Sequence, residues 1–180
     1  IKKAYPKAKI SVLEKNQHSV EMAISEGVVE KALQSIDEID RNTDLLFLCT
    51  PVEYNLRFLR DLTEKLSSHT LLTDVGSTKQ SIMEEAEALG LSARFCGGHP
   101  MAGSESSGYK ASDSLLLENA YYLLTPGQDF PTESIEKMKS FLSSIGSIPF
   151  VMSPEEHDKS VACVSHLPHL IAASLVKLLK

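Results

Sequence analysis

Short apolar runs alternate along most of the chain with longer amphipathic stretches. Apolar runs bounded by turn residues are typical of strands buried on both faces, and apolar positions with a period near 3.6 are typical of helices. The predicted strands are residues 8–14, 44–50, 70–75, 94–97, 121–125 and 148–152, and the helices between them include 17–26, 51–66, 79–89 and 132–144. This alternation predicts an α/β fold with a doubly wound, mainly parallel sheet of the Rossmann type.

Single residues mark the ends of several predicted helices. Asn16 is placed to cap the first helix and Gly27 to end it. Ser77 and Thr78 lie where a strand turns into the helix that begins at Lys79, so we expect one of them to cap its backbone amides. The other hydroxyl is then free to face a ligand.

The pattern changes after residue 153. From Pro154 the chain reads as one long helix, disturbed at Pro168, with an end too apolar to stand alone in water. We therefore predict a domain at residues 1–153 and the start of an all-helical domain at 154–180. A Rossmann-type domain normally opens with a strand and a glycine-rich turn, yet the chain contains no G-x-G-x-x-G. We expect a chain cut at both ends.

Composition narrows the classes of partner. The formal net charge of -6 speaks against nucleic acid and anionic membranes, which attract basic surfaces. No apolar run approaches the roughly 18 residues that a membrane span requires, and the opening lacks a signal peptide's apolar core, so we expect a cytoplasmic protein. The three cysteines, Cys49, Cys96 and Cys163, suit reduced, buried thiols better than a disulfide framework.

Three loops predict the position of a ligand site. Ligands of an open parallel sheet bind beyond the carboxyl ends of its strands. The loops at such ends are 49–51 (CTP), 74–79 (DVGSTK) and 97–103 (GGHPMAG). Their convergence at one edge of the sheet makes residues 1–153 a candidate dinucleotide-binding domain.

Glu14 and Lys79 are candidate cofactor residues in this setting. Glu14 ends the strand that carries, in dinucleotide-binding folds, the acid on the adenosine ribose. A carboxylate there repels a 2′-phosphate and favours NAD over NADP, although neighbouring Lys15 leaves NADP open. Lys79 and nearby backbone amides form a positive corner that can hold a carboxylate or orient a carboxamide.

His99 is the candidate general base. It follows two glycines and precedes a proline, a setting that brings backbone close to a ligand and fixes the direction of the ring. An imidazole of near-neutral pKa can take a hydroxyl proton as hydride leaves the same carbon. One alternative is a loop histidine bonded to backbone. Another is a Cys₂His₂ zinc site of Cys96, His99, Cys163 and His166, which we rank below a site without metal.

The last helix adds two candidate ligand residues. Ser165 and His169 are four residues apart and share a face, whereas His166 points elsewhere. Two polar residues on an apolar helix indicate a ligand-facing strip, and the alternative is a helix start with surface histidines.

Four motifs, LCTPV, DVGSTK, GGHPMAGSE and SHLPH, in this order and spacing resemble those of the prephenate and arogenate dehydrogenases of tyrosine biosynthesis. The resemblance runs over most of residues 8–180. It implies NAD(P)-dependent oxidative decarboxylation: hydride passes from the hydroxyl-bearing ring carbon to the nicotinamide, a base takes the hydroxyl proton, and carbon dioxide leaves as the ring becomes aromatic. It also implies a homodimer held through the helical domain.

The resemblance assigns roles to single residues. His99 matches the catalytic histidine, and Ser77 matches a serine that bonds the substrate hydroxyl and positions the nicotinamide. The remaining matches are Glu105 near the substrate entrance, Ser165 and His169 on the substrate side, and Thr50 and Pro51 in the loop that covers the cofactor.

Two other functions stay open at this point. A 3-hydroxyacid-type dehydrogenase would share the cofactor loops but use a lysine on the long helix, for which Lys159 is the only nearby candidate. A cofactor-binding or regulatory module without turnover is the second alternative, and the presence of His99 and Ser77 speaks against it.

Overall fold

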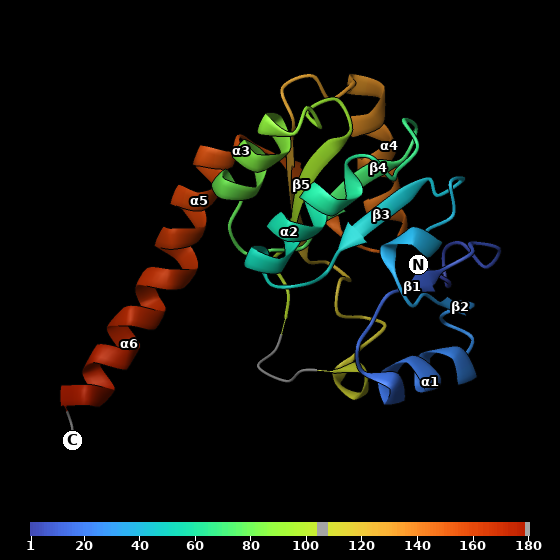
Figure 1. Cartoon of the computed structure of the whole chain (residues 1–180). Coiled ribbons are helices and arrows are strands. Elements are labelled where there is room, and N and C mark those ends of the chain that lie inside the picture. The colour runs from blue at the N-terminus through green and yellow to red at the C-terminus, as the bar shows by residue number, and fades with distance from the viewer. Residues whose placement is uncertain (104–107, 179–180) are drawn as a thin grey trace.

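The computed structural model describes residues 1–103 and 108–178, and a five-stranded sheet forms its centre (Figure 1). The strands lie in the order β3 (Leu45–Leu48), β4 (Leu71–Asp74), β5 (Phe95–Pro100), β6 (Tyr121–Pro126) and β7 (Ile148–Val151). The first three are parallel, β6 runs antiparallel to β5, and β7 is parallel to β6. The predicted mainly parallel sheet is confirmed. The reversal at β6 was not predicted, because apolar patterning carries no information on strand direction.

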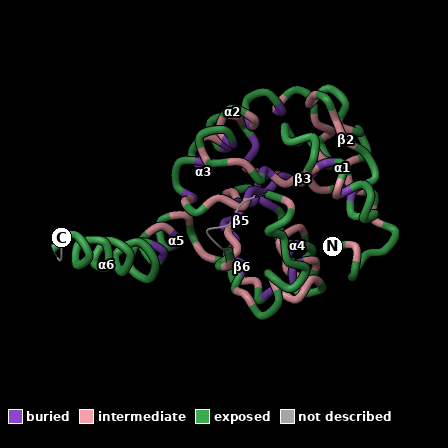
Figure 2. Tube along the Cα trace, turned by 90° about the horizontal axis from the view of Figure 1, so that it is seen from below, coloured by how far each residue is buried: buried purple, intermediate pink, exposed green. Residues whose placement is uncertain are grey.

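Helices cover both faces of this sheet (Figure 2). α2 (Val52–Leu62) and α3 (Gln80–Ala88) pack on the face that carries Leu48 and Leu72, and α4 (Thr132–Ser144) packs on the face that carries Leu45 and Leu71. Adjacent side chains on a strand point to opposite faces, so each strand contributes to both cores. This double burial explains why the predicted strands are apolar at nearly every position.

The amino-terminal part forms a smaller unit. α1 (Gln17–Ser25) connects β1 (Ser11–Val12) to β2 (Lys31–Ala32), and these strands form a separate two-stranded parallel sheet. The Asn16 side chain accepts the Ser19 N–H, and Gly27 adopts a φ of +69°, so both predicted helix ends are confirmed. The strand predicted over residues 8–14 is shorter than expected, because only two of its residues pair with β2.

The carboxyl-terminal part is one continuous rod that projects from the domain (Figure 1). α5 (Pro154–Val161) passes through a π-helical turn, η3 (Ala162–His166), into α6 (Leu167–Leu178). Pro168 has no N–H to donate to the preceding turn, and its ring crowds the carbonyl four residues back. The widened turn before it is the predicted disturbance, which is confirmed.

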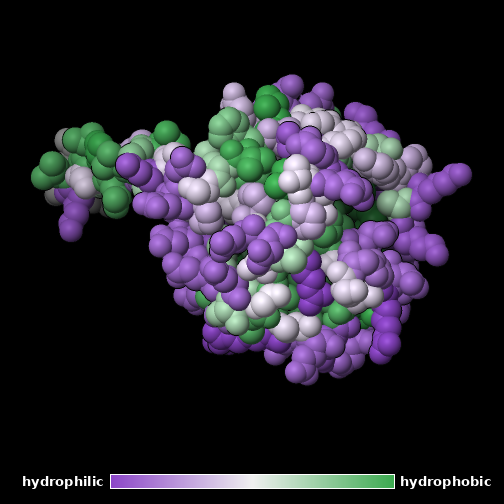
Figure 3. Space-filling model, turned by 90° about the horizontal axis from the view of Figure 1, so that it is seen from above, coloured by the Kyte–Doolittle hydropathy of each residue, from purple (hydrophilic) through white to green (hydrophobic). Residues whose placement is uncertain are grey.

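The projecting helix exposes its apolar side chains, which gather in Figure 3 as a green surface away from the domain. None of the residues of α6 is buried. Its exposed large hydrophobic residues are Leu167, Leu170, Ile171, Leu175, Val176 and Leu178. The helix Pro154–Leu178 is long and apolar enough, by length and composition alone, to cross a membrane. The expectation that no stretch approaches a span was therefore wrong for this helix.

The cysteines depart partly from expectation. All three are free thiols. Cys96 is buried in β5, as predicted, and burial raises its pKa to about 12. Cys49 and Cys163 are exposed, which contradicts the prediction of burial. Cys163 lies in the projecting helix, where no layer from residues 1–103 or 108–178 covers it.

Candidate active site

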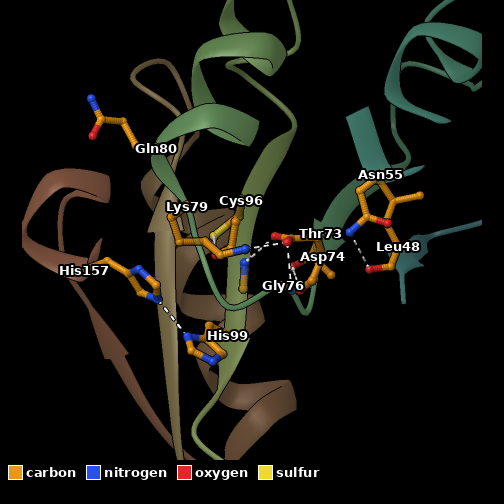
Figure 4. Close-up of polar contacts among 12 residues, drawn as sticks. Leu48, Asn55, Thr73, Asp74, Gly76, Lys79, Gln80, Cys96, His99 and His157 are labelled. Atoms are coloured by element: carbon orange, nitrogen blue, oxygen red, sulfur yellow. Dashed lines mark hydrogen bonds and ion pairs between the residues drawn. The ribbon is translucent and has the colours of Figure 1, made fainter. Parts of the chain in front are cut away.

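The carboxylate of Asp74 joins two of the three predicted loops (Figure 4). Asp74 ends β4 and is fully buried. Its Oδ2 accepts the Gly76 N–H at 2.9 Å, and its Oδ1 accepts the Gly98 N–H at 3.0 Å. A carboxylate that accepts from two segments holds both in one geometry. The loop after β4 is thereby fixed beside β5, one residue away from His99.

Lys79 is the cation of this cluster. Its side chain is fully buried, and its Nζ pairs with Oδ2 of Asp74. Burial lowers the pKa of the ammonium group, and the neighbouring Asp74 charge opposes that shift. The expectation that Lys79 offers a positive corner to a ligand was therefore wrong, because the ammonium group is buried and paired inside the protein.

The glycine pair before His99 allows close packing of β5. A Cβ on Gly98 would lie 2.5 Å from the Asp74 carbonyl oxygen and 2.9 Å from Oγ1 of Thr73, and a Cβ on Gly97 would lie 2.3 Å from Oγ1 of Thr125. Such distances are far inside van der Waals contact. The glycines thus bring β5 close to its neighbours.

We expect Gly98→Ala to lower the free energy of unfolding by about 1–3 kcal/mol, since the new methyl group must displace backbone. Urea denaturation of the full-length gene product measures this loss. Gly103→Ala is the matched control, because its Cβ would meet no atom within 4 Å. Equal stability of the two variants would contradict the packing role of Gly98.

His99 lies within β5, whereas a loop position was predicted. Its ring is half-buried, and its Nδ1 lies 2.9 Å from Nε2 of His157 in α5 (Figure 4). Nδ1 of His157 lies 2.7 Å from Oδ1 of Asp158. Burial, followed by electrostatic effects of His157 and Lys79, lowers the pKa of His99 to about 4. The ring is therefore neutral at physiological pH and available as a base.

Asp158 also caps α3. Its Oδ1 accepts the Lys79 N–H at 2.7 Å, and its Oδ2 accepts the Gln80 N–H at 2.9 Å. Burial acts to raise the pKa of Asp158, but these two donors and His157 outweigh it, so the pKa is below its ordinary value. The prediction that Ser77 or Thr78 caps this helix was wrong, because a carboxylate distant in the sequence supplies the acceptors.

Asn55, which no sequence pattern indicated, holds the loop after β3 in place. Asn55 of α2 is fully buried and donates to the Leu48 carbonyl oxygen at 3.3 Å. Thr50 donates its hydroxyl to Oδ1 of Asn55 at 2.6 Å, and Pro51 lies exposed before α2. Ser77 is exposed in the turn after β4, and its hydroxyl makes no hydrogen bond with the described residues.

The turn after β1 lies beside the start of α2. Oε1 of Glu14 accepts the Asn16 N–H at 2.8 Å, and Glu14 is exposed. The ammonium group of Lys15 lies 5.8 Å from the ring centroid of Tyr54, a residue of α2. This contact brings the predicted ribose-binding residue to the edge of the sheet where the β3 loop lies.

The predicted strip of Ser165 and His169 lies across the π-helical turn and the start of α6. Ser165 and His169 are exposed, and neither contacts His99 through a hydrogen bond in the described part of the chain. His166 lies close enough to act electrostatically on His99 and is the smallest of the causes that shift its pKa. The π-helical turn changes the angle between successive residues, so a four-residue spacing no longer defines one face here. Glu105 lies outside the described residues.

The geometry does not support the alternative zinc site or the alternative catalytic lysine. Cys96 and His99 are three residues apart on one strand and point to opposite faces, which does not suit a shared zinc ion. Residues 1–103 and 108–178 hold no group of three or more potential metal ligands. Lys159, the residue that a 3-hydroxyacid-type enzyme would need, is exposed on α5.

Two family models match the chain. The model described as "Prephenate dehydrogenase, nucleotide-binding domain" matches residues 1–151, and that described as "Prephenate dehydrogenase, dimerization domain" matches residues 153–180. The prephenate dehydrogenase of Bacillus subtilis (strain 168) is 39% identical over 178 residues, which are 98% of this chain and 48% of the relative. The chain thus spans about half the length of the curated relatives it matches.

Solved structures agree in fold. The prephenate dehydrogenase of Aquifex aeolicus in complex with hydroxyphenyl propionate and NAD+ superposes with a TM-score of 0.89 at 32% identity, covering 98% of this chain and 62% of that one. Synechocystis arogenate dehydrogenase gives a TM-score of 0.87 at 32% identity, covering 96% and 61%.

Proposed function

We propose a function from one established premise: this chain belongs to the prephenate dehydrogenase family. The proposed reaction of the whole protein is the NAD-dependent oxidative decarboxylation of prephenate to 4-hydroxyphenylpyruvate, with arogenate as the alternative substrate and tyrosine as its product. The observation that carries this proposal is His99, whose Nδ1 is held by His157 and whose Nε2 makes no hydrogen bond in the described residues. The relative from Aquifex aeolicus was solved with an aromatic carboxylate and NAD+, which supports the assignment.

His99 is the proposed general base. Its neutral ring accepts the proton of the substrate hydroxyl, which raises the electron density on the ring carbon and favours departure of hydride. Carbon dioxide then leaves and the ring becomes aromatic. Ser77 is proposed to bond the same hydroxyl, because its side chain is exposed beside the segment that Asp74 locks to β5. Glu105, Ser165 and His169 stay proposed substrate residues.

The exposed residues at the sheet edge fit a nicotinamide cofactor. Oε2 of Glu14 has no partner in the described part of the chain, so it is free to accept from ribose hydroxyls. Thr50, Pro51 and Ser77 are the proposed contacts nearer the reacting end. When bound, the nicotinamide supplies the acceptor for hydride.

The proposed partner in assembly is a second copy of the protein. A dimerization-domain model matches residues 153–180, and the apolar side chains of α6 are exposed in the single chain. Burying them against further helices removes apolar surface from water, which is favourable. A cytoplasmic location, and the absence of nucleic-acid and membrane partners, remain predictions.

Formation of reduced nicotinamide by the full-length gene product tests the proposed reaction. Prephenate and arogenate are each offered with NAD and with NADP, and absorbance follows the reduced cofactor. Turnover with at least one pair is expected, and the preferred pair names the specificity. The absence of turnover with all four pairs would reject the proposed function.

We expect Glu14→Gln to shift the cofactor preference toward NADP by about tenfold or more. Loss of the charge removes repulsion of the 2′-phosphate and weakens charge-assisted bonds to the ribose, which contribute about 1.5–3 kcal/mol. The ratio of kcat/KM for the two cofactors measures the shift. Glu21→Gln, an exposed change on α1, is the control. An unchanged ratio would remove Glu14 from the cofactor site.

The pH at which kcat/KM falls on the acid side should lie well below the ordinary pKa of histidine. The groups that act on His99 are His157, Lys79 and His166, which lower its pKa, and Asp158, which raises it; burial is the largest cause. Because the neutral ring is the reactive form, kcat/KM should hold from neutral pH and fall as the pH drops toward about 4. A profile between about pH 4 and pH 8 checks this. A midpoint near the ordinary value of about 6.5 would contradict it.

A further inference from the structure

A row of three side chains, Asp158, His157 and His99, connects the start of α3 to β5, and Figure 4 shows the contact between the two histidines. Asp158 accepts two backbone N–H groups of α3 and contacts Nδ1 of His157, whose Nε2 contacts Nδ1 of His99 at 2.9 Å. The His157 side chain is fully buried. Both of its ring nitrogens are therefore occupied by protein groups, so it cannot itself exchange a proton with a substrate. It can act only through His99.

The hydrogen-bond roles in this row follow from its first member. The pKa of Asp158 is below its ordinary value, so its carboxylate only accepts, and the hydrogen between Asp158 and His157 belongs to Nδ1 of His157. With a neutral His157, which the proposal requires, Nε2 carries no hydrogen and also only accepts. The hydrogen between the two rings must therefore belong to Nδ1 of His99. This leaves Nε2 of His99 as the unprotonated nitrogen.

We propose that His157, held by Asp158, is a positioning residue that fixes the tautomer and direction of His99 so that its Nε2 receives the substrate's proton. The proposal rests on the proposed function for the identity of the proton donor. The order of hydrogens along the row stands without it. After transfer, the proton resides on Nε2 of His99, and the Nδ1–H of the resulting imidazolium still donates to His157.

Neighbouring contacts hold the three side chains of the row in position. α5 carries both His157 and Asp158, and its start is closed by reciprocal bonds between Ser153 and Glu156. Lys79 is paired with Asp74, so its ammonium group does not compete for the carboxylate of Asp158. A base whose tautomer and direction are set before the substrate arrives avoids reorganisation during the reaction.

Imidazole ¹⁵N NMR of the full-length gene product tests the hydrogen order directly, because protonated and unprotonated ring nitrogens differ in chemical shift. The His99 signals are assigned by their loss in His99→Asn. In the wild type we expect His99 protonated at Nδ1 and bare at Nε2. A proton on Nε2 of neutral His99 would overturn the proposal, whether or not the protein turns over prephenate or arogenate.

Asp158→Ala should release the row. Without the carboxylate, no group in the described residues holds the hydrogen of His157 on Nδ1, so His157 can carry it on Nε2 and His99 can carry its own on Nε2. The nitrogen that takes up the substrate's proton is then partly occupied, and we expect kcat to fall about tenfold or more. Ser153→Ala is the matched control, since it removes a helix cap near the row without touching it. A His99 tautomer that is unchanged in Asp158→Ala would overturn the proposal.

Two substitutions of His157 separate positioning from packing. Gln places an amide oxygen near the position of Nε2 and can still accept from His99, whereas Asn is too short to do so. We expect His157→Asn to lower kcat about 100-fold with the KM for cofactor little changed, and His157→Gln to recover most of the loss. Equal kcat values, or losses that follow the melting temperature alone, would make His157 structural.

The proposed reaction and the proposed role of His157 can be rejected independently. A wild type that oxidises neither substrate, yet has His99 protonated at Nδ1 and loses this preference in Asp158→Ala, would reject the proposed reaction and keep the proposed role of His157. A wild type that is active but has its His99 proton on Nε2 would keep the reaction and reject the row.

Discussion

Replacing His99 with asparagine is expected to lower kcat of the full-length protein about 10²- to 10⁴-fold, the usual contribution of a general base. Asparagine keeps a polar group beside His157 but cannot take up a proton. The defect should lie in the chemical step, because the proposed cofactor contacts are other residues. Steady-state turnover with the preferred substrate measures the loss, and calorimetric titration with NAD measures cofactor binding, which should persist.

His69→Asn is the matched control for this experiment. His69 is exposed and lies before β4, outside the row of His157 and Asp158. It should keep the kcat of the wild type. A His99→Asn variant with nearly normal turnover would remove His99 from the chemistry and leave the family assignment in place.

Lys79→Met is expected to lower the free energy of unfolding by about 3–5 kcal/mol. Methionine has a similar length, so the loss comes mainly from the unpaired Asp74 carboxylate in a fully buried position. The effect should reach the site, because the same carboxylate holds Gly76 and Gly98. Urea denaturation measures the loss of stability.

Lys65→Met provides the comparison. Lys65 forms an ion pair with Asp37 in which both side chains are exposed, and such pairs contribute about 0–1 kcal/mol. The double variant Asp74→Asn, Lys79→Met should recover part of the loss, since it removes both charges together. Similar losses for Lys79→Met and Lys65→Met would show that the buried pair does not hold the loops.

Local sequence features were sufficient to predict the framework of the molecule. The strands over 44–50 and 70–75 and the helix over 132–144 were predicted because an apolar period reports burial, whatever the partner. Asn16 and Gly27 were predicted as helix ends because capping depends on neighbouring residues. The motif order also led to the correct family, since spacing along the chain is preserved in the sequence itself.

Contacts between segments that are distant in the sequence determine which groups surround His99. The sequence indicated Lys79 as a free cation and Ser77 or Thr78 as the cap of α3, because each is plausible locally. The structure assigns the buried charge of Lys79 to Asp74 and the cap to Asp158.

The sequence by itself predicted the elements, the sheet edge at which ligands are expected and His99 as the candidate base, because all three depend on local pattern. Only the tertiary structure decided what surrounds His99. His157 lies 58 residues from His99, and Asp158 lies 79 from Lys79. Neither position carries a local signal of its role, because hydrogen-bond partners are set by the packing of α5 against α3. The surroundings of the proposed base are therefore a property of the fold.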